Sequence, residues 1–181
     1  MSKVVIQGDT NGTGVFTLAS PNSNTDRTLT LPDEAGTLDR LERAGNVLQV
    51  LGFSQTLSFT TSSTSYTDTG ITGVTITPSS TSSKILLLAR MPTYTSRYGY
   101  GIQVKRNGTA IYTPGISPPY EMYCDPSTNA NLRVNWVMNI VDSPATTSAC
   151  TYTFFMAVNA GSSGVGEGYY TSFFTLMEIA A

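Results

Sequence analysis

The stretch Leu132–Ile140, with the sequence LRVNWVMNI, decides the fold class of this chain. Large apolar side chains stand at every second position, and mostly polar ones such as Arg133 and Asn135 stand between them. Successive side chains of a β-strand point to opposite faces of a sheet, so this alternation creates one apolar and one mostly polar face. The stretch therefore predicts a strand that packs one face on a core.

Similar strand patterns fill the C-terminal part of the chain. Residues 150–158 alternate in the same way, although Phe155 makes the second face less polar. Asn107-Gly108 separates two short strand-like runs and is the strongest hairpin signal in the chain. The run from Tyr169 to Ile179 has bulky side chains on both faces, which places it centrally in a sheet or at a subunit interface. About eight such runs predict an all-β, antiparallel jelly-roll β-sandwich over residues 51–181.

The first part of the chain has a different character. Residues 1–37 contain short alternating pieces separated by polar turns, with too little apolar surface to build a core of their own. Two interpretations remain open: a leader without fixed structure, or a β-rich segment ordered by copies of itself or by a larger assembly.

A charged stretch separates these two regions. Residues 38–50 begin with LDRLERAG, in which Asp39 and Arg43 have the i,i+4 spacing of a helical ion pair and Gly45 is a suitable stop. We expect a short helical linker here. Leu38 and Leu41 share one face of it, and so short a helix either packs around a threefold axis or fills a linker.

The composition argues against an enzyme. The chain has 181 residues, of which 12% are charged, and it contains no histidine, the commonest general base and metal ligand. Its acidic residues are scattered, without the close pair that glycoside hydrolysis needs. Asp125–Asn129 lacks the spacing of a calcium loop and is expected to form a turn. We therefore predict no catalytic residues, no metal site and no cofactor.

Charge and hydropathy also limit the partners. The net charge of −2 provides no footprint for nucleic acid or an anionic membrane. The longest aliphatic run, Ile85–Ala89, is far shorter than the roughly 20 residues that cross a bilayer, and the N-terminus lacks the apolar core of a signal peptide. We expect a soluble protein with no membrane insertion and no nucleic-acid partner. Cys124 and Cys150 are expected to be reduced.

A glycine-rich run near the C-terminus invites a phosphate-loop interpretation. Gly161–Gly168 has neither the Gly-Lys-Ser/Thr ending of a nucleotide-binding loop nor the GxGxxG spacing. We expect it to be a mobile loop joining two strands, suited to contact with a partner.

Tyrosines gather around Arg97 in segments rich in proline and glycine. Tyrosine rings pack against the apolar faces of sugar rings, and hydroxyl and guanidinium groups supply hydrogen bonds. The competing interpretation is that several of these tyrosines cap the sandwich or pack between subunits. The residues expected to bind a host receptor are Tyr94, Arg97, Tyr98, Tyr100, Tyr120 and Tyr123.

Several short motifs follow one another along most of the chain. They are Gly14–Leu18, Leu29–Pro32, Gly36–Leu38, Gly45–Val50, Thr64–Gly70, Ile76–Ser80 and Thr175–Ala181. In this order they resemble bacteriophage tail-fibre and related virion-fibre proteins. The resemblance implies an intertwined homotrimer with a narrow N-terminal shaft that attaches to other virion proteins. Its C-terminal jelly-roll head would be similar to trimeric complement-type and tumour-necrosis-factor-like heads.

The resemblance also implies roles for the residues outside the head. Strands in residues 1–37 would pack against their copies in the other two chains, which makes this region a shaft and attachment segment. The residues expected to serve virion attachment and trimerisation are Phe16, Leu18, Leu29, Leu31, Leu38 and Leu41.

The function implied by the resemblance is attachment without catalysis. The protein would be assembled in the bacterial host cytoplasm, become part of the virion, and present a trimeric head to a host-surface glycan or protein. The chain is short for a host-range fibre. A connector, collar or capsid-decoration fibre that binds another virion protein is therefore the alternative.

Overall fold

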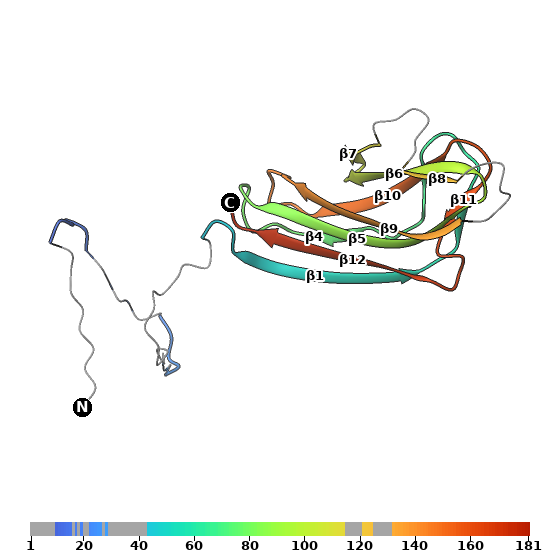
Figure 1. The fold of residues 1–181 in the computed structure, drawn as a ribbon. Coiled ribbons are helices and arrows are strands. Elements are labelled where there is room, and N and C mark those ends of the chain that lie inside the picture. The colour runs from blue at the N-terminus through green and yellow to red at the C-terminus, as the bar shows by residue number, and fades with distance from the viewer. Residues whose placement is uncertain are drawn as a thin grey trace. The chain divides into compact units, whose positions relative to one another are not determined.

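The computed structural model describes residues 10–15, 17, 19, 22–26, 28, 43–114, 121–124 and 132–181. The chain divides into two compact units, residues 1–38 and 39–181. All strands found among the described residues belong to the second unit, which Figure 1 shows as a two-layered β structure. No helix within the described ranges is long and apolar enough to cross a membrane.

The strands form two antiparallel sheets that pack face to face (Figure 1). The first, here called the β5 sheet, contains β1 (Val47–Thr56), β2 (Phe59–Thr61), β5 (Lys84–Thr95), β9 (Leu132–Asp142), β11 (Ser163–Val165) and β12 (Thr171–Ile179). The second, here called the β10 sheet, contains β3 (Thr67–Asp68), β4 (Val74–Ile76), β6 (Tyr98–Arg106), β7 (Thr109–Tyr112), β8 (Met122–Cys124) and β10 (Cys150–Val158).

Several short strands are parts of longer, interrupted ones. β11 leads into β12, and β2 continues β1 beside them, so both interrupted strands lie on the same side of β5. β3 and β4 likewise share one side of β10, and β7 and β8 share one side of β6. The orders are therefore β1/β2–β12/β11–β5–β9 and β3/β4–β10–β6–β7/β8. This is the strand order of a jelly roll, and it confirms the predicted antiparallel β-sandwich.

The core lies between the two sheets and follows the alternation of the strands. Trp136 in β9 is 7% exposed while its neighbour Val137 is 69% exposed, as the pattern of LRVNWVMNI predicts. Phe154 of β10 and Phe174 of β12 meet across the sandwich, with ring centroids 4.9 Å apart. Cys150 is buried in the same core as a free cysteine.

The chain enters and leaves the sandwich at one end. The amide of Gly45 donates to the carbonyl of Ala180 at 2.7 Å, and the amide of Ala180 donates to the carbonyl of Asn46 at 2.9 Å. Residues 47–50, predicted as the end of a helical linker, form the start of β1 instead, and the described part of the linker before them is a turn. Its remaining residues lie outside the described ranges, as do all six predicted trimerisation residues, Phe16, Leu18, Leu29, Leu31, Leu38 and Leu41.

The predicted Asn107-Gly108 hairpin is confirmed. Both residues have positive φ angles, 48° and 84°, and they connect β6 to β7. The Asn107 side chain also donates to the carbonyl of Ala149 and accepts from the amide of Thr151. A turn with two positive φ angles matches the twist of the strands that it joins, and asparagine and glycine tolerate these angles best.

The glycine-rich run at 161–168 differs from the loop that was expected. Ser163–Val165 form β11, which is buried between β2 and β5. A Cβ atom on Gly164 would lie 2.1 Å from the carbonyl oxygen of Phe59, so glycine allows the close approach of the two strands here. Only the residues on either side of β11 form a connection.

A buried carboxylate closes the entry end of the sandwich. Glu178 of β12 is fully buried and accepts hydrogen bonds from the side chain of Gln49 at 2.6 Å and from the amide and hydroxyl of Ser79, each at 2.7 Å. Burial raises the pKa of Glu178, but these hydrogen bonds favour the ionised form more strongly, and the net effect lowers the pKa from 4.5 to about 2.

This carboxylate makes stability depend on acidity. A pKa that is lower in the folded state means that Glu178 stabilises the fold fully above about pH 4.5, and this contribution is lost as the pH falls toward 2. Glu178→Gln should lower the free energy of unfolding near neutral pH by about 1–3 kcal/mol, because the amide cannot accept all three bonds. Urea unfolding between pH 7 and 2.5 should show the two proteins converging in acid. A constant difference would contradict the assignment.

Candidate ligand-binding groove

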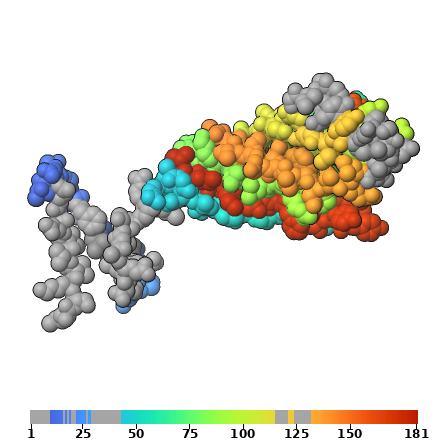
Figure 2. Space-filling view, viewed as in Figure 1, coloured from blue at the N-terminus to red at the C-terminus, as the bar shows by residue number. Residues whose placement is uncertain are grey.

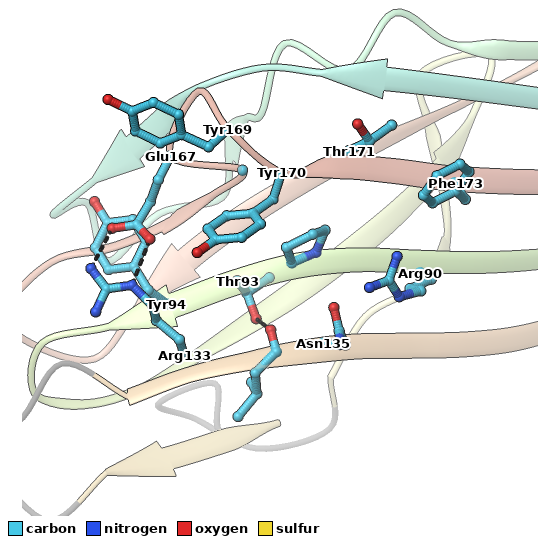
Figure 3. A pocket seen from close by; sticks show the side chains of 13 residues that line it. Arg90, Thr93, Tyr94, Arg133, Asn135, Glu167, Tyr169, Tyr170, Thr171 and Phe173 are labelled. Atoms are coloured by element: carbon cyan, nitrogen blue, oxygen red, sulfur yellow. Dashed lines mark hydrogen bonds and ion pairs between the residues drawn. The ribbon is translucent and has the colours of Figure 1, made fainter.

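A groove of about 500 Å³ opens on the outer face of the β5 sheet, at the end where β5 finishes (Figure 3). Its floor consists of outward-facing positions of β5 and β9, and its wall comes from the segment between β11 and β12. Its lining includes Arg90, Pro92, Tyr94, Arg133, Asn135, Glu167, Tyr170 and Phe173.

The wall is a tight turn held by backbone hydrogen bonds. The amide of Gly166 donates to the carbonyl oxygen of Pro92 at 2.9 Å, and the amide of Gly168 donates to that of Leu57 at 3.1 Å. Within the turn, the amide of Tyr170 donates to the carbonyl oxygen of Gly166 at 3.0 Å. Gly166, Glu167 and Gly168 all have positive φ angles. The turn interrupts the strand between β11 and β12 and carries two tyrosines above the sheet. We call residues 166–170 the bulge.

An ion pair ties the bulge to β9. Arg133 Nε and Nη2 donate to the two carboxylate oxygens of Glu167 at 2.7 and 2.8 Å. This two-point contact lowers the pKa of Glu167 below its usual value. Both side chains therefore stay charged at neutral pH and present a fixed set of donors and acceptors at the edge of the groove.

Aromatic rings form much of the remaining wall. In Figure 3 the ring of Tyr170, which is 51% exposed, lies between the Arg133–Glu167 pair on one side and Arg90 with Phe173 on the other. Phe173 is 50% exposed, and the guanidinium carbon of Arg90 lies 5.7 Å from its ring centroid. This contact has cation–π geometry.

The groove has more positive than negative charge. Its lining contains two guanidinium groups and one carboxylate, while the whole chain has a net charge of −2. Arg133 is already paired with Glu167. Within the part of the chain that the structure describes, Arg90 has no carboxylate partner. Arg90 is therefore the charge that remains available to a ligand.

The structure places the predicted receptor residues in different environments. Tyr94 lines the groove, and its hydroxyl lies 2.6 Å from the Thr60 hydroxyl. Tyr100 is fully buried, its hydroxyl lies 2.5 Å from that of Thr93, and burial is the main cause that raises its pKa to about 12. Tyr100 is therefore a core residue and cannot touch a receptor, which corrects the prediction. Inward-facing positions of β6 bury even a polar ring when a hydroxyl partner is present.

The other predicted receptor residues lie outside the groove. Arg97 is exposed in the turn between β5 and β6, and Tyr98 begins β6 with a φ of 54°. Tyr123 in β8 is exposed opposite Gly99. None of these three residues lines the groove. Tyr120 lies outside the described residues.

The groove residues that sequence reasoning missed come from separated segments. Arg133 stands on the polar face of the LRVNWVMNI strand, Glu167 lies within the glycine-rich run, and Tyr170 follows that run. Only the antiparallel pairing of β5 with β9 and β12 brings them together. The adjacent pair Tyr169-Tyr170, directly after the glycines, was the one local signal of an exposed aromatic site.

The carboxylates of the sandwich occupy separate hydrogen-bonded sites. Glu121 accepts from the Tyr112 hydroxyl at 2.6 Å, the Ile102 amide at 2.7 Å and the Trp136 indole at 3.1 Å. Asp142 accepts from Arg106 and from the Tyr152 hydroxyl. Among the described residues, no three histidine, cysteine, aspartate or glutamate side chains gather as a metal site would require.

The outer face of the β5 sheet also has an apolar row, near the end where the chain enters the sandwich. Val50, Met177, Leu86 and Val141 are aligned across β1, β12, β5 and β9, and we call them the apolar band. Val50 is 55% and Val141 is 60% exposed, and the two central residues are half-buried. In Figure 2 the surface areas contributed by these four strands lie side by side.

The outer face of the β10 sheet is polar by comparison. Thr75 and Thr151 exchange a hydrogen bond there, and Lys105 covers the ring of Phe155, with its ammonium 3.8 Å from the ring centroid. The outer face of the β5 sheet is thus mixed, with the apolar band near the entry end and the charged groove further along the strands. An antiparallel sheet commonly leaves a polar face to water, so an exposed apolar row on its outer face is unusual.

No family model and no curated protein matches this chain. Several solved structures that match this chain are of virus particles. T=1 particles derived from infectious bursal virus match over 85% of this chain and 41% of theirs, at 9% identity and a TM-score of 0.35. The Gx strain of infectious bursal disease virus matches over 87% and 43%, at 16% identity and a TM-score of 0.35.

A third match is the VP2 subviral particle of the same virus, over 74% of this chain and 38% of that one, at 14% identity and a TM-score of 0.33. The chain therefore spans less than half the length of these virus-particle proteins. The jelly-roll assignment rests on the strand pairing of this chain itself.

Proposed function

We propose that the chain is a non-enzymatic fibre protein of a virus particle. Three copies associate, residues 1–37 attach the trimer to other virion proteins, and the sandwich is presented for attachment to a host surface. The single observation that carries this proposal is the apolar band. The motif resemblance described above supplies the virion setting.

The apolar band supports association between copies. It crosses β1, β12, β5 and β9 without a charged residue, and its edge members are more than half exposed in the single chain. Exposed apolar patches of this kind mark protein contacts, because burying them gains about 25 cal/mol per Å². Because the band itself carries no charge, it can meet a copy of itself without desolvating ions.

The positions of the two surface features support attachment at the far end. The apolar band lies near Gly45, where the chain enters, and the groove lies at the opposite ends of β5 and β12. The nearest groove residues, Arg90 and Phe173, lie four positions along their strands from Leu86 and Met177, which is about 14 Å at about 3.4 Å per residue. A subunit held through residues before β1 therefore keeps its groove exposed.

Light scattering coupled to size exclusion tests the association. The full-length chain should have three times the mass of a single chain. Met177→Lys places a charge in the centre of the apolar band and should raise the concentration needed for association at least about tenfold, which corresponds to 1.4 kcal/mol. Thr75→Lys, on the polar face of the β10 sheet, is the matched control and should leave the mass unchanged. A monomeric native chain would contradict the proposal.

Binding measurements separate the two virion roles. Fluorescent full-length protein should bind intact host cells and compete with the virus for them. If it instead binds a capsid or baseplate protein and ignores cells, the chain has the connector or decoration role that the sequence left open.

A further inference from the structure

We propose that the groove beneath the bulge binds a sugar ring that has a carboxylate substituent. This inference rests on the proposed attachment function and names the ligand class and the residues of that site. The structure supports it through the shape of the groove, its aromatic wall, its fixed hydrogen-bonding groups and its charge.

The size of the groove suits a small ligand. Its volume of about 500 Å³ falls within the roughly 300–1,000 Å³ that is usual for small-molecule sites. The floor at Pro92 and Asn135 is part of two paired strands and is preformed.

The aromatic wall provides a surface for a sugar ring. Tyr170 presents about half of its surface, and its backbone is held to Gly166 at 3.0 Å, so the ring starts from an ordered position. The C–H faces of a pyranose are apolar and pack on aromatic faces, while a tyrosine hydroxyl keeps contact with water. Pro92 adds a second apolar surface beneath the ring.

Polar groups stand where ring hydroxyls would lie. A guanidinium has five N–H donors, and Glu167 occupies Nε and Nη2 of Arg133, so other donors remain. The side chains of Asn135 and Thr171 also line the groove and provide both donors and acceptors. Neighbouring donors and acceptors held on a scaffold are what adjacent sugar hydroxyls require.

Charge determines which sugar is favoured. Arg90 lies on the opposite side of Tyr170 from the Arg133–Glu167 pair in Figure 3. Its guanidinium lies over the Phe173 ring, a contact that orients it without neutralising it. A carboxylate on the sugar would pair with Arg90 in a charge-assisted hydrogen bond, whereas a neutral sugar would leave that donor set to water.

Each site is expected to be weak and to act in numbers. The groove is shallow and open, and the ligand would keep much of its surface in water. Three copies in one trimer and several trimers on one particle would raise the effective affinity by orders of magnitude without new contacts.

Saturation-transfer NMR on the full-length protein tests the proposal. The probes are oligogalacturonate, oligoglucuronate and oligomannuronate, each beside its neutral hexose counterpart. At least one acidic probe should bind, with an affinity that exceeds its neutral counterpart by about tenfold, the value of one charge-assisted bond. Arg90→Gln should remove this preference, and Tyr170→Ala should weaken binding of both forms by about tenfold.

Phe155→Ala is the matched control, because it removes an aromatic side chain from the outer face of the β10 sheet, outside the groove. It should leave binding unchanged. Equal binding of acidic and neutral probes, an affinity left unchanged by Tyr170→Ala, or no binding of any probe would each overturn the proposal. The trimeric mass and cell binding of the native chain would be untouched by that result, so failure of the groove and failure of the proposed function give different outcomes.

Discussion

Replacing Phe174 by alanine is expected to lower the free energy of unfolding by about 3–5 kcal/mol, the range for large aromatic residues in a core. Phe174 is only 2% exposed, and its ring meets those of Phe154 and Phe53, with centroids 4.9 and 6.1 Å away. It joins the two sheets in the middle of the sandwich. The alanine would leave a cavity that paired strands cannot close.

Phe173→Ala provides the matched control, since it removes the same side chain from the next residue. Phe173 faces outward, is 50% exposed, and contacts Arg90. Loss of the Phe173 ring should lower the free energy of unfolding by about 1 kcal/mol or less. Urea unfolding of both variants at one protein concentration gives the comparison. Equal losses would mean that the outer face is as fully packed as the core in the native protein.

Gly166→Ala should destabilise the sandwich by about 3 kcal/mol, through a left-handed backbone cost of about 1–2 kcal/mol plus overpacking. Gly166 has a φ of +78°, and an added Cβ atom would lie 2.0 Å from the carbonyl oxygen of Leu57. That oxygen belongs to the backbone between β1 and β2, so relief requires the bulge or the strand to move. Movement of the bulge would also displace Tyr170 and reduce ligand binding.

Gly168→Ala separates the two causes. Gly168 lies in the same bulge with a φ of +76°, but a Cβ atom there would meet only Ser58 Cβ at 3.8 Å, an ordinary contact. Gly168→Ala should lower the free energy of unfolding by about 1–2 kcal/mol, through the left-handed backbone conformation alone. Thermal unfolding should therefore rank native, Gly168→Ala and Gly166→Ala in that order. Equal effects of the two variants would show that crowding at Leu57 contributes nothing.

The alternation of side chains predicted the sandwich because it is a local signal. Trp136 is buried and Val137 is exposed, exactly the order of faces that the period of two requires. Bulky side chains on both faces of Tyr169 to Ile179 predicted a strand either central in a sheet or at a subunit interface, and β12 does lie between β1 and β5. The glycine-rich run was misjudged because glycine marks both loops and close strand contacts.

The candidate site was much harder to predict from sequence. Tyr94 and Tyr100 are six residues apart with similar neighbours, yet one lines the groove and the other is fully buried. Whether each ring is exposed or buried depends on the turn between β5 and β6, because that turn places the two tyrosines in different sheets. Arg90, Arg133 and Glu167 meet only through long-range strand pairing, which no local pattern encodes. In the sequence alone, the exposed apolar residues of the band look the same as core residues.

The antiparallel pairing of β1 with β12 has a mechanical consequence. If the chain serves as the proposed fibre, tension acts between Gly45, where the chain enters, and the groove further along the sheet. That pull acts along β1 and loads its hydrogen bonds to β12 in shear, so that they resist together. A pull across the strand would open the same bonds one after another and at lower force. The sandwich is therefore oriented to withstand the load that attachment would impose on it.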